Sequence, residues 1–488
     1  MEEIKIIEEN TKLKAKTLSG MIWMFLERIG AQLVSFIVSV VLARLLMPED
    51  YGVIAIVTIF ITLCNVFVDG GFGNALVQKK DADVVDFSSV FYFSFSFSVV
   101  LYVILFFAAP YLANLYQMDI LCPLFRVMGL RLIIASFNSI QKAYVSRNLQ
   151  FKKFFWSTII GTVISAVVGI VMAYSGFGVW ALVGQYLTNV VIDTLVLFIT
   201  VRWHPIWAFS LSKMKTLVSY GWKVLVGSLI DTFYEEFRAL YIGGLYTAQD
   251  LAYYTRGKQF PYLIINNTNS TIMSVLFPVM SKKQDDNMEL KRLTRRAIKT
   301  SSYIIMPVMF GLASIAKPLV LLLLTEKWLP CVPFLQILCF NAALMPIQSA
   351  NVQTIYALGR SDIALRLNII KKTTGFLIIL FSARISVLAM AYGGIAIGVI
   401  CSIVNAFPNK KLIQYGYLEQ MKDLLPSIGL SCLMSIPVFL LASLPIPVVL
   451  ILLIQVIVGA LAYVTLSALF REESFLYLSQ TLKQFCKK

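Results

Sequence analysis

The stretch LSGMIWMFLERIGAQLVSFIVSVVLARLL, residues 18–46, gives the first indication of the architecture because it is apolar along nearly its whole length. A helix needs about 20 mostly apolar residues to cross the hydrocarbon core of a bilayer, whereas the apolar core of a signal peptide has only about 7–15. We therefore expect an uncleaved membrane-spanning helix here, preceded by a polar cytoplasmic segment over residues 1–17.

The composition extends this interpretation to the rest of the chain. Of the 488 residues, 58% are hydrophobic and only 14% are charged, and the mean hydropathy is +0.78. Soluble domains average roughly 45–50% apolar and about 25% charged residues, so a soluble chain of this composition would expose a large apolar surface. The sequence predicts a polytopic membrane protein.

Fourteen segments are long and apolar enough to be membrane spans. They are continuous apolar runs rather than the alternating segments of roughly 10 residues that form membrane β-barrels. The expected fold class is therefore all-α, with about 14 transmembrane helices. Their approximate limits are 18–46, 52–77, 87–110, 121–146, 151–174, 178–200, 216–245, 250–280, 297–324, 331–358, 363–390, 392–416, 424–443 and 446–469.

The positions of Lys and Arg orient these spans. Loops on the cytoplasmic side of a membrane are enriched in basic residues, and most of the 42 basic residues lie in alternate loops, above all in 281–299. This pattern predicts that both termini are cytoplasmic and that the chain is a multi-pass protein of the cell inner (cytoplasmic) membrane. The net charge of +16 then reflects topology, and no nucleic-acid partner is expected.

Several classes of enzyme are disfavoured. The single histidine, His204, leaves no multi-histidine metal site and no Ser-His-Asp triad, and no P-loop for ATP is present. Asp81-Ala82-Asp83 has the D-x-D form of metal-dependent glycosyltransferases, but no nucleotide-binding domain surrounds it. We expect a protein that is not an enzyme and has no catalytic residue, metal or other cofactor.

A weak internal repeat suggests two lobes. A shift of 200 residues places LARLLMPEDYG (42–52) on IGGLYTAQDLA (242–252), with Asp50 on Asp250. Parallel repeats related by an axis along the membrane normal are an established transporter plan. The predicted parts are an N-lobe of six helices (18–200), a linker (201–215), a C-lobe of six helices (216–416), helices 13 and 14 (417–470) and a cytoplasmic tail (471–488).

Basic residues within the predicted spans are candidates for substrate binding. Each charge near mid-membrane costs roughly 2.5–3.5 kcal/mol, so a bundle with several of them is expected to line a wet cavity. Arginine in such a cavity suits phosphate, because guanidinium binds phosphate oxygens bidentately. The predicted substrate-binding residues are Arg28, Arg131, Lys223, Arg238, Arg256 and Lys258.

Acidic residues within the spans are candidates for ion coupling, because burial raises the pKa of a carboxylate. The predicted ion-coupling residues are Asp69, Asp231 and Glu235. Asp231 and Glu235 have an alternative role as ion-pair partners of Lys223 and Arg238, since residues three or four apart meet on a helix surface.

Short motifs run in order along most of the chain. They are LARLLMPEDYGVIA (42–55), DGGFGNALVQKKDAD (69–83), FGVWALVGQ (177–185), FPVMSKKQDD (277–286), LTEKWLP (324–330) and ALGRSD (357–362). In series they resemble the polysaccharide and O-antigen export branch of the multidrug/oligosaccharidyl-lipid/polysaccharide exporter superfamily, in particular the colanic-acid and teichuronic-acid exporters.

The resemblance implies a V-shaped bundle of two six-helix lobes around a basic central cavity. It also implies a flippase that moves a polyprenyl-pyrophosphate-linked oligosaccharide from the inner to the outer leaflet by alternating access. Basic cavity residues hold the lipid phosphates in relatives, and Arg28 and Lys223 correspond by their place on the first span of each lobe. Expected partners are this lipid-linked glycan, membrane lipid and other polysaccharide-assembly proteins, and the protein is expected to be a monomer.

Two other functions remain open. An ion-coupled multidrug or cation exporter of the same fold would need an acidic, aromatic cavity, whereas the charges within these spans are mostly basic. A polysaccharide polymerase or ligase would need a sizeable extracytoplasmic loop, and the longest connection predicted is the cytoplasmic segment 281–296. The flippase interpretation is therefore favoured.

Overall fold

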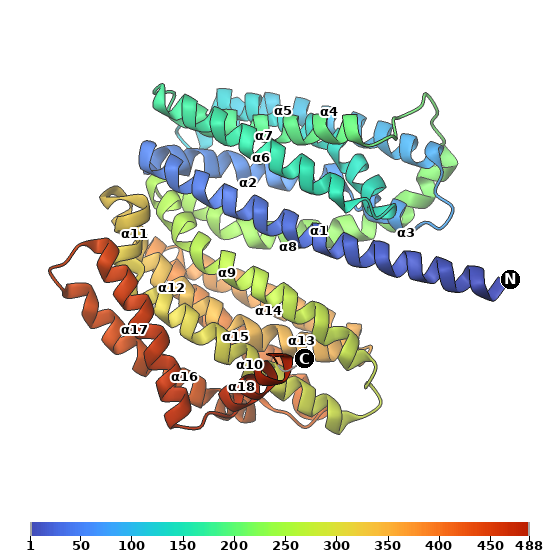
Figure 1. The fold of residues 1–488 in the computed structure, drawn as a ribbon. Coiled ribbons are helices and arrows are strands. Elements are labelled where there is room, and N and C mark those ends of the chain that lie inside the picture. Colours follow the sequence, from blue (N-terminus) through green and yellow to red (C-terminus); the bar gives the residue numbers. More distant parts are fainter. Residues whose placement is uncertain (1, 487–488) are drawn as a thin grey trace. The chain divides into compact units, whose positions relative to one another are not determined.

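The computed structural model describes residues 2–486, and every regular element among them is a helix (Figure 1). This confirms the predicted all-α class. The chain forms two compact units, Met1–Leu251 and Ala252–Lys488.

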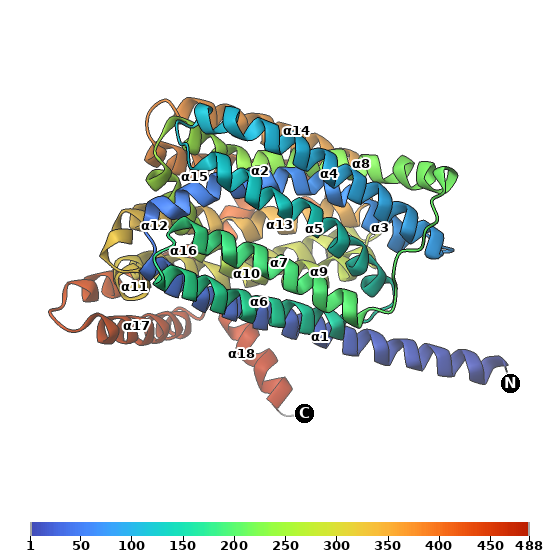
Figure 2. The ribbon, with the colours of Figure 1, turned by 90° about the horizontal axis from the view of Figure 1, so that it is seen from above.

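The first unit contains eight α-helices within the described part of the chain. In both views α1 runs alongside α6, and these two helices pack together (Figure 1, Figure 2). The bounds are α1 (Glu2–Leu45), α2 (Pro48–Asp69), α3 (Phe72–Gln78), α4 (Val84–Leu115), α5 (Leu121–Arg147), α6 (Phe151–Tyr174), α7 (Val179–Thr200) and α8 (Leu211–Leu245).

The second unit begins within α9 and ends with a short helix after the last long one. Helices α10 and α11 are bent by 68° at the break between them. The bounds are α9 (Ala248–Ser281), α10 (Asn287–Ser314), α11 (Ala316–Leu324), a 3-10 helix (Glu326–Cys331), α12 (Val332–Ala343), α13 (Met345–Ala357), α14 (Ser361–Ser382), α15 (Val387–Leu412), α16 (Tyr417–Leu440), a 3-10 helix (Leu441–Ser443), α17 (Val448–Leu469) and α18 (Glu473–Cys486).

Ten helices of the described chain are long and apolar enough to cross a membrane, and the bent pair α10–α11 raises the number to eleven. The other three predicted spans correspond to α8, α9 and α14. These helices have 35, 34 and 22 residues and are long enough to cross a membrane, but they are not among the helices that are also sufficiently apolar. The polytopic fold is thus confirmed, while spanning by α8, α9 and α14 stays a prediction.

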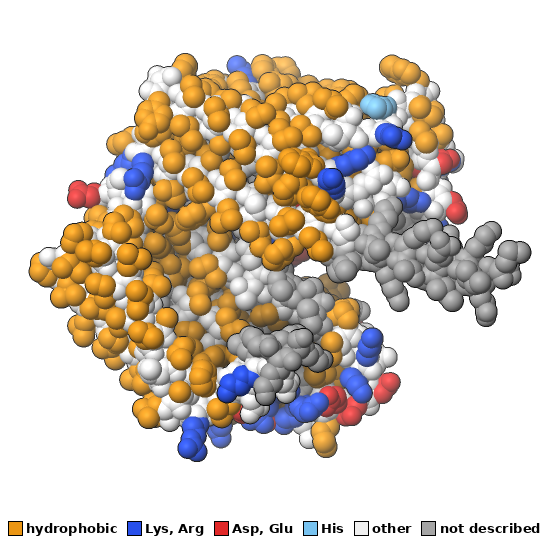
Figure 3. All heavy atoms as spheres, viewed as in Figure 1, with side chains coloured by type: hydrophobic (Ala, Val, Ile, Leu, Met, Phe, Trp, Pro, Cys, Tyr) orange, Lys and Arg blue, Asp and Glu red, His pale blue; other side chains and the backbone are white. Residues whose placement is uncertain are grey.

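Hydrophobic side chains are exposed over much of the molecular surface. Figure 3 shows them over a large part of the face in view. Phe107, Ile199 and Leu469 are exposed by 75%, 79% and 76%. Such a surface is unfavourable in water and suits contact with lipid acyl chains, as expected for a membrane protein.

The predicted linker, residues 201–215, is part of the first unit and packs against α4. The hydroxyl oxygens of Ser88 and Ser89 on α4 accept hydrogen bonds from the backbone N–H groups of Ile206 and Ser210, at 3.1 and 3.0 Å. Helix α8, predicted to be the first of the C-lobe, packs against α2, α3 and α4 within the same unit. The division into lobes at residues 201–215 stays a prediction.

Two turns of the chain have the same cap. Between α1 and α2, Asp50 Oδ2 accepts a hydrogen bond from the backbone N–H of Met47 at 3.0 Å. Between α8 and α9, Asp250 Oδ2 accepts one from the N–H of Thr247 at 3.2 Å. Because Asp50 and Asp250 are the residues matched by the shift of 200, the shared cap supports the predicted repeat.

The second of these turns lies against the start of α2. A Cβ atom at Gly52 would lie 1.8 Å from the carbonyl oxygen of Ala248, so a larger residue cannot be accommodated without backbone movement. Glycine therefore allows α2 to approach this backbone closely.

Candidate functional site

The candidate site is a cavity of about 450 Å³ in the first unit, among α2, α3, α5 and α8. Its lining combines one acidic and one basic residue with hydroxyl and amide groups, and apolar side chains complete it. The polar residues that line it are Asp69, Asn74, Ser139, Lys142, Ser146 and Ser228.

Two glycines place Asp69 at this cavity. Gly70 and Gly71 follow the last residue of α2 and have φ values of 50° and 69°, which end the helix in the left-handed region. A Cβ atom at Gly71 would lie 2.8 Å from Cβ of Val224 on α8. The glycine pair of the DGGFG motif thus turns the chain sharply and allows α8 to approach it.

Lys142 supplies the positive charge of the cavity. Its Nζ lies 3.2 Å from Oδ2 of Asp193 on α7, and Asn138 Nδ2 donates to the same oxygen at 2.6 Å. The Asp193 side chain is 12% exposed, whereas that of Lys142 is 49% exposed. The ammonium group is therefore held by a buried carboxylate on one side while the side chain also reaches the cavity.

On α5, Arg131 lies beside a residue of α7, as Lys142 does. The guanidinium carbon of Arg131 lies 5.9 Å from the centre of the Tyr186 ring, within the range of a cation–π contact. Arg131 is half-buried. Its position is thus set by an aromatic neighbour rather than by a carboxylate.

The predicted charges on α1 and α8 are mostly exposed. Arg28 on α1 and Lys223 on α8 are both exposed, and Lys223 directly precedes Val224, which lines the cavity. Asp231 and Glu235 are exposed and Arg238 is half-buried on the same helix.

Two predicted residues lie in the second unit and contact aromatic rings. Arg256 is 6% exposed, donates to Gln259 Oε1 at 2.6 Å, and has its guanidinium carbon 5.1 Å from the centre of the Trp328 ring. Lys258 Nζ lies 5.2 Å from the centre of the Tyr262 ring. Burial holds Arg256 among protein groups, which the sequence did not indicate.

Other charges of the first unit are fixed by several partners. Arg147, at the end of α5, donates to the carbonyl oxygens of Leu76 at 2.7 Å, of Lys80 at 2.6 Å, and of Lys79. The Leu76 carbonyl belongs to the last turn of α3, where helical carbonyls lack partners within the helix, and the other two belong to the residues directly after it. Arg147 thus anchors the α3–α4 loop to α5.

The D-x-D motif contributes to the same region. Asp83 accepts a hydrogen bond from the N–H of Asp86 at 2.9 Å and caps α4. It also pairs with Lys213 at 2.5 Å, and this bond, followed by the Asp86 N–H, lowers the pKa of Asp83 to about 2. Lys79 pairs with Asp86 at 2.6 Å. The motif thus has a structural role in capping α4 and binding the linker.

The sequence did not single out most of the residues that line the cavity. Lys142, Asn74, Ser139 and Ser228 are not among the predicted substrate-binding or ion-coupling residues. The DGGFGN motif, which contains Asn74, was the available signal. Within residues 2–486, no group of three or more His, Cys, Asp or Glu side chains could hold a metal ion.

The fold of this chain is similar to that of solved membrane-protein structures. The structure is similar to the lipid II flippase MurJ in an inward closed conformation, with a TM-score of 0.72 at 16% identity over 93% of this chain and 98% of that one. It is also similar to an inward-facing MATE transporter of the MOP superfamily, with a TM-score of 0.62 at 15% identity over 79% and 96%. The fold is therefore that of this superfamily.

The chain also has relatives in sequence. An uncharacterized membrane protein in the cps region of Klebsiella pneumoniae is 26% identical over 423 residues, 83% of each chain. The succinoglycan biosynthesis transport protein ExoT of Rhizobium meliloti is 24% identical over 352 residues, 72% of this chain and 71% of its own.

A family model described as a polysaccharide biosynthesis protein matches residues 41–333, more than half of the chain, and confirms the resemblance inferred from the motifs. The protein therefore belongs to the polysaccharide biosynthesis protein family, as a polytopic membrane protein.

Proposed function

We propose that this protein moves a polyprenyl-pyrophosphate-linked oligosaccharide from the inner to the outer leaflet of the cytoplasmic membrane. The observation that carries the proposal is a polar cavity with Lys142 in its lining, in a chain that belongs to a polysaccharide biosynthesis family. An ammonium group binds phosphate as a point charge. The hydroxyl and amide groups of Asn74, Ser139 and Ser228 suit sugar hydroxyls.

The transport cycle follows from the same groups. Lys142, together with the exposed Arg28 and Lys223, attracts the pyrophosphate, while the prenyl chain stays in lipid against the apolar surface. Alternating access then exposes the headgroup outside. A membrane that is negative inside favours this direction by roughly 2.3 kcal/mol per negative charge per 100 mV. Asp69, Asp231 and Glu235 are the proposed ion-coupling groups, and Arg131, Arg238, Arg256 and Lys258 are further proposed substrate contacts.

The test is rescue of a strain that lacks this protein. In this strain we expect lipid-linked oligosaccharide to accumulate in the inner leaflet. Periodate does not cross the membrane, so when it is added outside it cannot oxidise the sugars of this accumulated lipid. Wild type should restore oxidation, whereas Lys142→Gln, Arg28→Ala and Lys223→Ala should restore it poorly. Lys80→Gln is the control, because Lys80 is an exposed loop lysine outside the cavity.

Each outcome separates the functions. Equal rescue by wild type and all variants would remove these basic residues from substrate binding. No accumulation in the deletion strain would exclude a lipid-linked glycan as the substrate. Export of cationic drugs would then be the function to test, because the fold is shared with a multidrug transporter.

A further inference from the structure

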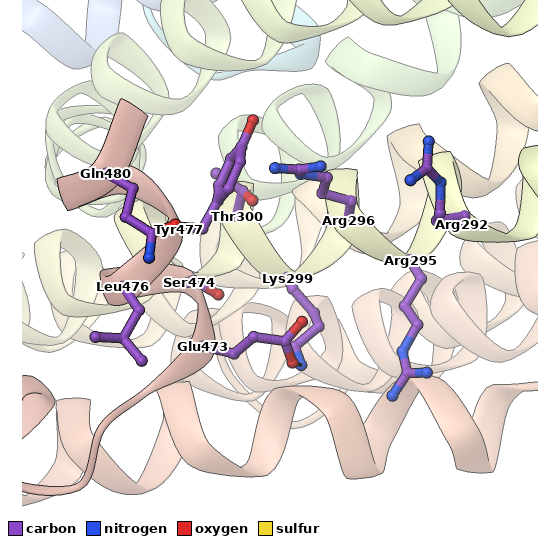
Figure 4. A pocket seen from close by; sticks show the side chains of 10 residues that line it. All are labelled: Arg292, Arg295, Arg296, Lys299, Thr300, Glu473, Ser474, Leu476, Tyr477 and Gln480. Carbon is purple, nitrogen blue, oxygen red and sulfur yellow. Dashed lines mark hydrogen bonds and ion pairs between the residues drawn. The ribbon is translucent and has the colours of Figure 1, made fainter. Parts of the chain in front are cut away.

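A second charged cleft lies in the second unit, between α10 and the C-terminal helix α18. It has a volume of about 530 Å³. Helix α10 contributes four basic residues, Arg292, Arg295, Arg296 and Lys299. Helix α18 contributes Glu473, Tyr477 and Gln480 from the opposite side (Figure 4).

Packing fixes α18 against the rest of the unit. Phe475 and Leu478 pack on a buried cluster that includes Tyr303 and Tyr463. At the start of the helix, Glu472 is 6% exposed and accepts a hydrogen bond from the N–H of Phe475 at 2.9 Å. The cleft therefore has two walls that are each held in place.

The four basic residues differ in how fully they are neutralised. Arg295 lies 2.6 Å from the buried Asp423, and Lys299 pairs with Glu473. Arg292 contacts Glu289 on its own helix at 2.6 Å, while its side chain stays 69% exposed.

Arg296 has a different neighbour. Its guanidinium carbon lies 3.3 Å from the centre of the Tyr477 ring, and no carboxylate among the described residues pairs with it. Figure 4 shows the guanidinium groups of Arg292 and Arg296 on the side of α10 on which Tyr477 lies, with Arg295 directed away from it. In the part of the chain that the structure describes, Arg296 thus has no carboxylate partner, and the side chain of Arg292 stays largely exposed beside its single partner Glu289, so an anion can approach both.

An apolar pocket adjoins the cleft. It has a volume of about 490 Å³, and Lys299 and Glu473 line both spaces. Its apolar lining comes from α16 and from Phe470, directly after α17. A Cβ atom at Gly429 in this lining would meet no atom within 4 Å, so the pocket is open there.

We propose that an anionic phospholipid binds here, with its phosphate between Arg292 and Arg296 and one acyl chain in the pocket beside Gly429. A basic cleft joined to an apolar pocket matches an amphiphile better than a soluble anion. The predicted topology places both at the cytoplasmic surface, where anionic lipids attract basic residues. The proposal is independent of the transported substrate.

The test is native mass spectrometry of the purified, delipidated full-length protein. It is titrated with phosphatidylglycerol, phosphatidylcholine or glycerol 3-phosphate. Wild type should retain phosphatidylglycerol in preference to the other two. The double variant Arg292→Gln/Arg296→Gln should bind it about 25-fold more weakly, because each basic residue at an anionic surface contributes roughly a fivefold gain in affinity. The double variant Lys282→Gln/Lys283→Gln removes the same charge from the exposed loop before α10 and should bind as wild type does.

A second variant tests the acyl pocket. Gly429→Leu fills open space and should weaken phosphatidylglycerol binding while all four basic residues remain. The site would be overturned if the arginine variant retained as much phosphatidylglycerol as wild type. It would also be overturned if the Lys282/Lys283 control lost as much binding as the arginine variant. Glycerol 3-phosphate binding as tightly as phosphatidylglycerol, or no effect of Gly429→Leu, would overturn the assignment to a phospholipid. Size-exclusion profiles verify that each variant is folded.

Discussion

The charges of the first unit form two groups that are satisfied to different degrees. In the loop group, Arg147 donates to three carbonyl oxygens and Asp83 is bound by Lys213 and a backbone N–H. In the cavity group, Lys142 has one buried carboxylate partner and a side chain that is 49% exposed, and Asp69 is exposed beside it. A group whose bonds are complete has a structural role, whereas a partly satisfied group in a cavity is available to a ligand.

The largest effect should come from the loop group. Arg147→Met removes three charge-assisted hydrogen bonds and leaves carbonyl oxygens of the α3 end without partners, which should lower the free energy of unfolding by about 3 kcal/mol. Thermal unfolding in detergent measures this loss of stability. Arg202→Met is the control, because Arg202 is exposed. If both variants melt at the wild-type temperature, Arg147 does not have the structural role that separates the two groups.

The next effect tests the turn that positions Asp69. Gly71→Ala introduces a Cβ at φ 69° and 2.8 Å from Val224, and we expect a loss of stability of about 2 kcal/mol. Gly176→Ala has the same backbone problem at φ 80° but meets no atom within 4 Å. Thermal melts of the two variants separate backbone strain from the close approach of α8. Identical melting temperatures would show that this approach contributes nothing.

A smaller effect should come from the counter-ion of the cavity lysine. Asp193→Asn leaves Lys142 without its carboxylate, so an anionic substrate should bind about fivefold more tightly if the ammonium group faces it. The apparent affinity for lipid-linked oligosaccharide in proteoliposomes measures this effect. A purely structural Lys142 predicts the opposite result, a loss of stability with no gain in affinity.

The smallest effect concerns the pH dependence of the loop group. Because the folded-state pKa of Asp83 is lowered to about 2, its contribution to stability is present above the unfolded pKa of about 4 and disappears as the pH falls through about 2. The raised pKa of Lys213 keeps the pair charged through neutral pH. Asp83→Asn should flatten the melting temperature between about pH 4 and pH 2 relative to wild type. An unchanged acid profile would remove Asp83 from this account.

Much of the fold could be predicted from the sequence, because the apolarity and length of the helices are local properties. The family could be predicted as well, since motifs such as 42–55 and 69–83 are contiguous. Helices α8, α9 and α14 are long enough to span, but charged and polar residues interrupt their apolar sequence.

The roles of individual charges could not be predicted, because they depend on partners distant in sequence. Arg147 and Lys142 lie five residues apart at the end of the predicted span 121–146, yet one binds the end of α3 and the other lines a cavity. The burial of Arg256 beside Trp328, 72 positions later in the sequence, could not be predicted either.

The close approach of Gly52 to Ala248 limits which residues the two similar turns can exchange. Both turns have the same aspartate cap, yet the position that matches Gly52 in the other copy is Ala252, which is fully buried. The two turns thus have the same backbone cap, but their side chains cannot be exchanged. A chimaera that copies residues 242–252 over 42–52 would preserve the cap and still place a methyl group 1.8 Å from a carbonyl oxygen. Symmetry between the copies is therefore broken at the residue where the second turn meets α2.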